Sequence, residues 1–344
     1  MELLGLPVES SCCLQSRRSW VRLPSARSTS IDVMARPHGP IGENTLQKSE
    51  AAQRTAQIDG SMHGSAPSIG PSEIAGLIQL ARSEGGISLA DDKGEFLRLR
   101  LGRLLREAGC ASFADYLSKL RRPDATDMRR KFVEALTTHT TSFFRERRHY
   151  DFMRDCAIPA LTSEGVGTKR PLQIWSAACS TGAEIWSAAM LLETTSSVDG
   201  RALDWRGMGT DLSERILRRA TNAVYIEEET VGIPPELARR FLLRRSPRTP
   251  EEPCLFRIVP ELRERTRFLK ANLLALDSGP NIAADIAFLR NVLIYFEPAD
   301  RQKVARDVAA RIRPGGYLFT GHAESLGNTV PNLRQEAASI YRRT

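Results

Sequence analysis

The sequence predicts an α/β fold: a Rossmann-like parallel sheet with a small antiparallel β insert, preceded by an all-α N-terminal domain. Two observations predict it. From Pro71 to about Tyr150, apolar residues recur at the spacing of one helix face, and from Pro171 short apolar runs alternate with helical segments. Such alternation is typical of a parallel sheet covered on both faces. We therefore expect a helical domain over residues 71–150 and an α/β domain over residues 151–344.

Residues 1–70 differ in composition from the rest of the chain. Ser, Arg, Pro and Gly dominate there, and no apolar periodicity lasts for more than a turn. Such a segment cannot bury a core, so we expect a disordered leader. Its arginines among many serines also resemble a transit peptide, although no amphipathic helix accompanies them. Met34 offers an alternative start of translation.

Four helices are predicted in the helical domain, and the second is the most regular. Its apolar residues follow the i, i+4, i+7, i+8 spacing of one buried stripe: Leu97, Leu101, Leu104, Leu105 and Ala108. Asp91 or Asp92 is predicted to cap its start, and Gly109 to end it. The arginines of the same segment fall mostly on the opposite side of the helix.

In the α/β domain, each predicted strand is a short apolar run followed by a turn. These runs are Leu172–Cys179, Trp205–Thr210, Asp285–Leu289 and Tyr317–Gly321. Helices are predicted after the first three. Between Ile233 and Leu273 the alternation breaks, and we expect an antiparallel β subdomain over about 233–271. Its predicted strands begin at Phe241, Leu255 and Arg267.

Composition limits the possible partners. A net charge of +8 over 344 residues predicts an acidic partner: nucleic acid, an anionic membrane surface or a carboxylate-rich protein. Apolar runs such as Val292–Phe296 are far shorter than the roughly 18 residues that span a bilayer, so no membrane insertion is expected. Six cysteines without CxxC spacing and only five histidines predict reduced thiols and no metal site.

The turns after predicted strands are the candidate ligand-binding positions, because ligands of open α/β sheets bind beyond the carboxyl ends of the strands. The turn Ala178–Glu184 is built of small residues but has one Gly instead of GxGxxG, which disfavours a phosphate-binding loop. Asp211 ends the second strand, where an acid can accept both ribose hydroxyls or simply cap the next helix. Arg290 and Asn291 follow a later strand as polar ligands or as turn residues.

Three such turns without a pyrophosphate loop predict a nucleoside ligand that lacks phosphates. S-adenosylmethionine fits this description, so a methyltransferase is the leading hypothesis from the residues themselves.

Six motifs, in this order along the chain, resemble the CheR chemotaxis receptor methyltransferases. They are Thr137–Glu146, Ile174–Glu184, Gly209–Asp211, Asn272–Leu273, Leu289–Phe296 and Gly315–Ser325. The resemblance covers about residues 71–341. It implies a Rossmann-like methyltransferase that uses S-adenosylmethionine, releases S-adenosylhomocysteine and methylates receptor glutamates in bacterial chemotactic adaptation, that is, a protein-glutamate O-methyltransferase.

The resemblance also implies roles for individual residues. Those that correspond to the family's cofactor contacts are His139, Thr141, Arg145, Glu184, Asp211, Asn272, Leu273, Arg290 and Asn291. Glu184 would meet the methionine portion of the cofactor and Asp211 the ribose. The family usually has Asn where this chain has His139, and Glu-Glu-Pro-Tyr where it has Ala-Glu-Ile-Trp at 183–186.

Methyl transfer to a carboxylate needs no general base, because the carboxylate is already ionised near neutral pH. Positioning therefore matters most, and Arg145 is predicted to hold a carboxylate of the substrate or cofactor bidentately. The alternative is that Arg145 is one half of a surface ion pair. Tyr295 is predicted to orient the same carboxylate through its hydroxyl. The arginines Arg98, Arg100, Arg103 and Arg106 have two interpretations: a solvated helix face, or, as the resemblance implies, a surface that binds acidic receptor helices.

Two alternatives belong to other functional classes. The basic charge also fits a nucleic-acid methyltransferase, but Arg290–Leu293 stands where amino-methylating DNA enzymes carry Asp-Pro-Pro-Tyr or Asn-Pro-Pro-Tyr. A non-catalytic module that senses S-adenosylmethionine is the second. The leading hypothesis implies chemoreceptors as partners, no nucleic acid, a monomer and a cytoplasmic location. The Pro-rich loop 245–253 lacks Gly, so we expect methylation without tethering to a receptor tail peptide.

Overall fold

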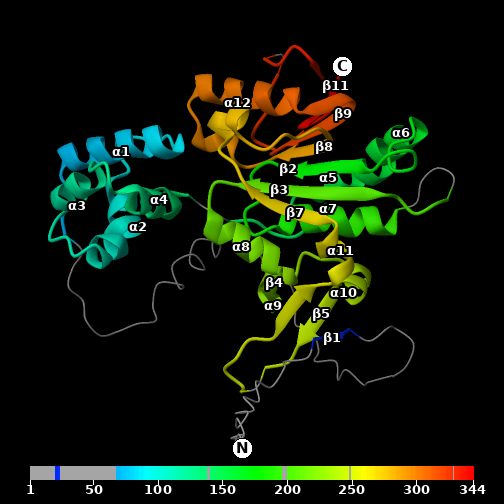
Figure 1. Cartoon of the computed structure of the whole chain (residues 1–344), viewed down its shortest axis with the longest axis horizontal. Coiled ribbons are helices and arrows are strands. Elements are labelled where there is room, and N and C mark those ends of the chain that lie inside the picture. Colours follow the sequence, from blue (N-terminus) through cyan, green and yellow to red (C-terminus); the bar gives the residue numbers. More distant parts are fainter. Residues whose placement is uncertain (1–19, 24–66, 138–139, 196–199, 248, 328) are drawn as a thin grey trace, which may run out of the picture. The chain divides into compact units, whose positions relative to one another are not determined.

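The computed structural model describes residues 20–23, 67–137, 140–195, 200–247, 249–327 and 329–344 (Figure 1). The chain divides into two compact units: a helical unit of residues 25–138 and 292–304, and a sheet unit of residues 1–24, 139–291 and 305–344. The boundary predicted at residue 150 is therefore wrong. Phe143 and Tyr150 are buried in the core of the sheet unit, and this packing assigns their segment to it.

The helical unit contains α1 (Pro71–Gly85), α2 (Gly94–Glu107), α3 (Phe113–Leu120) and α4 (Thr126–Leu136), together with the short η4 (Leu293–Tyr295). The apolar stripe predicted on α2 is buried, and Ser112 caps α3 by accepting the amide of Asp115 at 3.2 Å. The predicted cap of α2 is wrong. Lys93 is the N-cap residue and α2 has no side-chain cap, because the chain turns once more between Asp91 and Gly94.

The sheet unit is built on seven strands in the order β10-β11-β9-β8-β2-β3-β7. Their bounds are β2 (Leu172–Ser176), β3 (Trp205–Asp211), β7 (Thr266–Lys270), β8 (Ala284–Leu289), β9 (Ile312–Thr320), β10 (Leu333–Ala337) and β11 (Ile340–Arg343). The five strands from β7 to β9 are parallel, and β11 and β10 complete the sheet antiparallel. The predicted α/β fold with a parallel sheet is confirmed. Strand order reverses at β2, which makes this the topological switch point where ligands bind.

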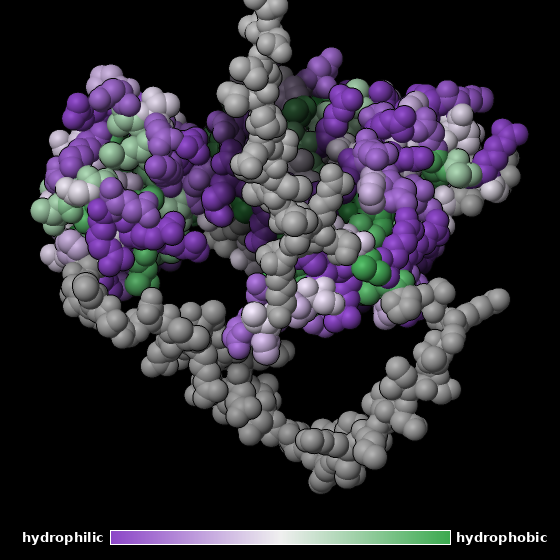
Figure 2. All heavy atoms as spheres, turned by 60° about the horizontal axis from the view of Figure 1, so that its bottom comes forward, coloured by the Kyte–Doolittle hydropathy of each residue, from purple (hydrophilic) through white to green (hydrophobic). Residues whose placement is uncertain are grey.

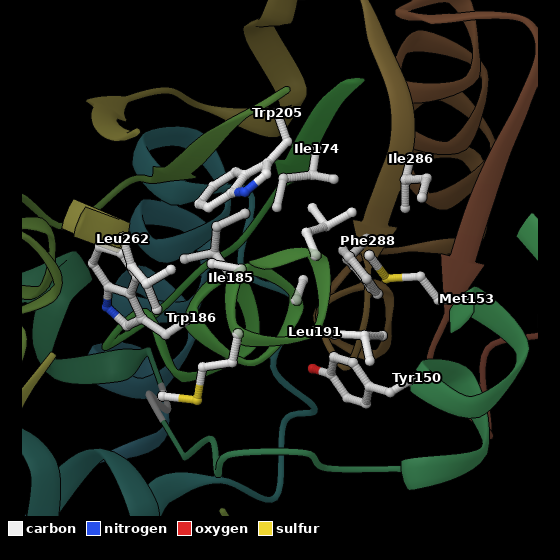
Figure 3. Packing of buried hydrophobic residues seen from close by; sticks show 14 of the residues in the cluster. Tyr150, Met153, Ile174, Ile185, Trp186, Leu191, Trp205, Leu262, Ile286 and Phe288 are labelled. Carbon is white, nitrogen blue, oxygen red and sulfur yellow. The ribbon is translucent and has the colours of Figure 1, made fainter. Parts of the chain in front are cut away.

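Helical segments precede β2 and lie between later strands in the sequence. They are α5 (Arg147–Phe152), the π-helical η2 (Met153–Ala157), α6 (Ile158–Ser163), α7 (Ala183–Thr194), α8 (Glu214–Asn222), the 3-10 segment η3 (Leu273–Ser278) and α12 (Pro298–Ala310). Figure 3 shows side chains of α5, α7 and the strands packed together. Trp175, Trp186 and Trp205 are almost fully buried, so α7 and the centre of the sheet form one rigid support.

A second, four-stranded sheet has the order β1-β5-β6-β4, and all of its pairs are antiparallel. Its strands are β1 (Val21–Arg22), β5 (Leu242–Arg245), β6 (Leu255–Ile258) and β4 (Val224–Ile226), and α9 (Glu227–Thr230), α10 (Pro235–Phe241) and α11 (Pro260–Glu264) lie nearby in the sequence. The antiparallel insert is therefore present, with different bounds from the predicted 233–271.

Two predictions about this region are wrong. The segment Arg267–Lys270 is not a strand of the small sheet: it belongs to β7 and pairs parallel with β3. The leader is not wholly without structure, because Val21 and Arg22 form a strand. Two residues are too few for any periodic signal, and the strand exists because β5 offers it a free edge. No helix among the described residues is long and apolar enough to cross a membrane.

Candidate active site

The residues predicted to bind the cofactor stand at the carboxyl ends of neighbouring parallel strands. Asp211 ends β3, Asn272 follows β7 and Arg290 follows β8, while Glu184 lies in the first turn of α7, just beyond β2. Because β7, β3, β2 and β8 are adjacent and parallel, these ends meet at one edge of the sheet. We call this set of strand ends the carboxyl edge.

Asp211 holds the loop that follows β2. One carboxylate oxygen accepts the amide of Ser180 at 3.0 Å, and the other accepts the amide of Ser213 at 3.0 Å. The loop is tight: Ser180 has φ +50° and Gly182 has φ +89°, and a Cβ on Gly182 would lie 2.8 Å from the indole nitrogen of Trp186. The Asp211 carboxylate thus lies at the carboxyl edge, where it suits hydroxyl groups and repels phosphate.

The Glu184 side chain is 12% exposed and is held on both oxygens. The Ser176 hydroxyl donates to Oε1 at 2.6 Å, and the Arg290 guanidinium donates to Oε2 at 3.0 Å. Burial raises the pKa of Glu184, while Arg290 and Ser176 act in the opposite direction. The carboxylate keeps further lone pairs that can accept from a cationic ligand.

Arg290 links this acid to the loop that precedes α5. Its side chain is only 2% exposed, it donates to the carbonyl of Arg145, and it lies 3.4 Å from a carboxylate oxygen of Glu146. The loop has two non-glycine residues with positive φ, Phe144 at +52° and Glu146 at +57°. Such backbone strain persists only where surrounding contacts enforce it. Arg290 supplies contacts to Arg145 and Glu146, and the Ser187 hydroxyl accepts the amide of Phe144 at 2.9 Å.

His149 completes this buried group. Its Nδ1 lies 3.4 Å from Glu146 Oε2, and the side chain is 6% exposed. The pKa of His149 is lowered to about 4, mainly by burial and also by the nearby Arg290 and His322, while Glu146 acts to raise it. Burial alone would raise the pKa of Glu146, but Arg290 and His149 hold it below its usual value. We name Glu184, Arg290, Glu146 and His149 the buried charge cluster.

The other residues predicted to contact the cofactor differ in their surroundings. Asn272 uses its Oδ1 to accept the amide of Leu274 at 3.0 Å, and Leu273 is buried. Asn291 has φ +57°, and its amide donates to Glu324 at 2.6 Å. Thr141 is half-buried. His139 lies outside the described residues.

Arg145 has no acidic partner among the described residues. Its guanidinium donates to the carbonyl of Thr140 at 3.3 Å. The alternative interpretation of Arg145 as one half of a surface ion pair therefore finds no partner within the described chain. A half-buried guanidinium with free donors is suited to bind a carboxylate.

Tyr295 and the four arginines of α2 belong to the helical unit. The backbone carbonyl of Tyr295 accepts the amide of Ser88 at 2.8 Å, which fixes its segment within that unit. On α2, Arg98 donates to both carboxylate oxygens of Glu95, at 2.7 and 2.6 Å, whereas Arg100, Arg103 and Arg106 are exposed. Arg98 is therefore engaged within its own helix.

Sequence reasoning missed several residues of the site. Ser176, Glu146 and His149 contact the predicted residues, but nothing in their local pattern signals burial. Glu324 is 4% exposed and accepts the amides of Asn291 and Gly321, although its motif predicts no individual role for it. A buried acid after the strand Tyr317–Gly321 was the available signal.

S-adenosylmethionine has an ammonium group, a carboxylate, a ribose diol and no phosphate, and the residues at the carboxyl edge fit these groups. Glu184 suits the ammonium group and Asp211 suits the diol. The Ser180 amide donates to Asp211 and holds its carboxylate in place. The Nε of Arg290 is buried with no hydrogen-bond partner among the described residues, which leaves a donor for an anionic group. No three His, Cys, Asp or Glu side chains of the described residues group as a metal site would require.

A doubly wound sheet with this set of acids and no phosphate loop defines the class of S-adenosylmethionine-dependent methyltransferases. Residues 139–341 match the family described as "CheR methyltransferase, SAM binding domain", and residues 72–137 match "CheR methyltransferase, all-alpha domain". The chain belongs to the CheR methyltransferase family.

Relatives of the whole protein agree with this assignment. "Chemotaxis protein methyltransferase 2" of Pseudomonas aeruginosa is 36% identical over 74% of this chain and 87% of its own length. "Chemotaxis protein methyltransferase" of Escherichia coli is 32% identical over 76% of this chain and 87% of its own. The predicted cofactor and the predicted methyltransferase activity in chemotaxis are confirmed, and the nucleic-acid and non-catalytic alternatives are not favoured.

Proposed function

We propose that this methyltransferase transfers the methyl group of S-adenosylmethionine to glutamate carboxylates on the cytoplasmic helices of bacterial chemoreceptors. It would act as a monomer in the cytoplasm, near receptor arrays. The observation that carries the proposal is Arg145: its half-buried guanidinium has no acidic partner among the described residues, and its backbone is attached to the buried charge cluster through Arg290.

The bound cofactor supplies the methyl group, and the protein supplies position and charge. Glu184, fixed by Ser176 and Arg290, would bind the ammonium of the methionine portion, and Asp211 would accept the ribose hydroxyls. Thr141, His139, Asn272, Leu273 and Asn291 would complete the binding surface. Each of these roles follows from the residue's chemistry and its correspondence to the family's motifs.

Arg145 would pair bidentately with a carboxylate and so fix its direction. Correct orientation of two reacting groups can contribute roughly 7–11 kcal/mol to a reaction that needs no general base. Arg290 and Glu146 would act as positioning residues, because they hold the strained loop that carries Arg145. Tyr295 is proposed to orient a substrate carboxylate through its hydroxyl, and Tyr295→Phe tests that role.

The exposed side of α2 would receive the receptor. Leu99, which is 69% exposed, lies four residues before Arg103 and seven before Arg106, so the three side chains share one stripe. An apolar contact flanked by arginines suits a helix that carries glutamates. Figure 2 shows that hydrophilic side chains cover most of the visible described surface, with apolar ones scattered among them.

A transfer assay with tritiated cofactor and membranes that contain the cognate receptors tests the reaction. We expect label on the receptor that mild base releases as methanol, because an ester is base-labile and a methylated nitrogen is not. Arg145→Ala should abolish most of the transfer while Arg148→Ala, an exposed neighbour, should not. Base-stable label, or full turnover by Arg145→Ala, contradicts the proposal.

A further inference from the structure

The small sheet has an edge that the chain covers with its own N-terminal region. In the order β1-β5-β6-β4, β5 pairs with β6 on one side and with β1 on the other. The register places Val21 opposite Arg244 and Arg22 opposite Leu243. Figure 1 shows β1 beside β5. Without residues 20–23, β5 would be an exposed edge strand, and such edges accept extended peptides from other chains.

Side chains on both sides of β1 hold the segment in place. The ring of Trp20 lies under two guanidinium groups, with Arg245 at 5.2 Å and Arg257 at 5.9 Å from its centroid. Arg22 forms an ion pair with Glu261. Leu23 packs on the apolar core of the sheet unit. The contacts thus come from β5, β6 and α11, so the docking is specific in side chains as well as in backbone pairing.

We propose that residues 20–23 are an internal occupant of a strand-addition site on β5, and that they close this edge to other chains. An extended peptide from any partner must displace β1, together with the Trp20 stack and the Leu23 contact, before it can pair with β5. The inference does not depend on the substrate of the enzyme. A chain that begins at Met34 would lack the occupant and present an open edge.

Amide hydrogen exchange in the full chain tests the occupancy. The double variant Trp20→Ala, Leu23→Asp removes the ring and places a charge against apolar neighbours. Because alternate residues of an antiparallel strand pair with opposite neighbours, only those amides of 242–245 that face β1 should respond. We expect them to exchange at least tenfold faster in the variant, while the amides of β6 (255–258) stay protected and report an intact sheet. Val21→Thr is the control, since Val21 is 61% exposed.

Binding of a labelled peptide of residues 18–24, followed by fluorescence anisotropy, tests the site itself. The double variant should bind the peptide at least tenfold more tightly than the wild-type chain, and a scrambled peptide should bind neither. Equal affinity for both chains, binding to neither, or equally fast exchange of β5 in both chains overturns the proposal. Protection that rises with protein concentration would assign the strand to a second copy and overturn the internal assignment.

Discussion

Arginine pairs with glutamate in two regions of this molecule, and the pairs differ in their surroundings. In the buried charge cluster, the Arg290 side chain is 2% exposed and meets Glu184 at 3.0 Å and Glu146 at 3.4 Å. On α2, the Arg103 side chain is 79% exposed and lies 3.4 Å from Glu107. The distances are similar, but water screens the second pair far more than the first, where Glu184 is 12% and Glu146 22% exposed.

The difference shows which charges support the fold and which are available to a partner. A buried charge that loses its counterion is left without compensation, whereas exposed pairs contribute about 0–1 kcal/mol. The buried charge cluster should therefore tolerate almost no change, and the arginines of α2 should be replaceable without loss of stability. Substitutions in the two regions test the two sides of this comparison.

The largest effect is expected for Arg290→Leu. Removing the guanidinium leaves the largely enclosed carboxylates of Glu184 and Glu146 without their cation, and we expect the free energy of unfolding to fall by about 3–5 kcal/mol. Urea unfolding of the purified chain measures it. Arg103→Leu is the matched control and should change the free energy of unfolding by less than about 1 kcal/mol.

A double variant identifies the cause of that loss. If uncompensated charge is responsible, the double variant Arg290→Leu, Glu184→Gln should lose less free energy of unfolding than the sum of the losses of the two single variants. Strict additivity would mean that lost packing of the long side chain, and not charge, explains the single variant.

A smaller effect is expected from His149, and it depends on pH. Its pKa is about 4 in the folded chain against an ordinary value of 6.5, so below pH 6.5 the unfolded state takes up the proton first. The stability contributed by neutral His149 is complete above pH 6.5 and is lost as the pH falls towards 4. The total is at most about 3.4 kcal/mol, at 1.36 kcal/mol for each unit of pKa.

Replacement of His149 by Gln should flatten the decline in the free energy of unfolding between pH 6.5 and pH 4.5. Glu146 affects a lower window, because its pKa is lowered and its contribution is lost only as the pH falls below about 4.5. An unchanged slope for His149→Gln would show that the pKa of His149 is not lowered in the folded chain.

Asp211 lies at the carboxyl edge and is half-buried, so its exposure is between that of Arg290 and that of Arg103. Asp211→Asn keeps one oxygen to accept a backbone amide and loses a charged acceptor for the ribose. The free energy of binding S-adenosylhomocysteine should become less favourable by about 1.5–3 kcal/mol, the usual range for a hydrogen bond to a charged group. Calorimetry measures it. Asp204→Asn, beyond the other end of β3, should bind as the wild type does.

The comparison also explains how far the sequence could predict the structure. Alternation of apolar runs with helical segments was sufficient for β2, β3 and β8, because buried parallel strands are continuous apolar runs. It failed for Arg267–Lys270, whose mixed polar pattern at the sheet margin resembles that of an antiparallel strand. It also failed for β1, where tertiary pairing and not local pattern determines the structure.

Within the site, the sequence predicted which residues lie at strand ends, but not which side chains contact one another. Asp211 and Arg290 lie at strand ends as expected, since strand boundaries follow from the pattern. The sequence did not show that Arg290 binds Glu184, or that Glu146 and His149 stand beside it, because these contacts join segments more than a hundred residues apart. Whether a charge is buried depends on such packing, so the two arginine regions look alike in sequence.

The smallest effect on stability, and a specific effect on function, is expected when the charge of Arg100, Arg103 and Arg106 is reversed to Glu. Only the i, i+4 contact with Glu107 becomes repulsive, which costs about 0.2–0.5 kcal/mol, so the fold and the cofactor affinity should be unchanged. The apparent KM for receptor should rise, and the rise should shrink with salt, because exposed charges are screened over roughly 8–10 Å. Arg121→Glu, Arg122→Glu and Lys131→Glu together make the same change in net charge elsewhere in the helical unit, where all three side chains are exposed. If this control raises KM equally, the receptor responds to overall charge. If only the α2 variant does, the exposed arginines of α2 form a docking surface, which their exposure to solvent leaves open to a partner.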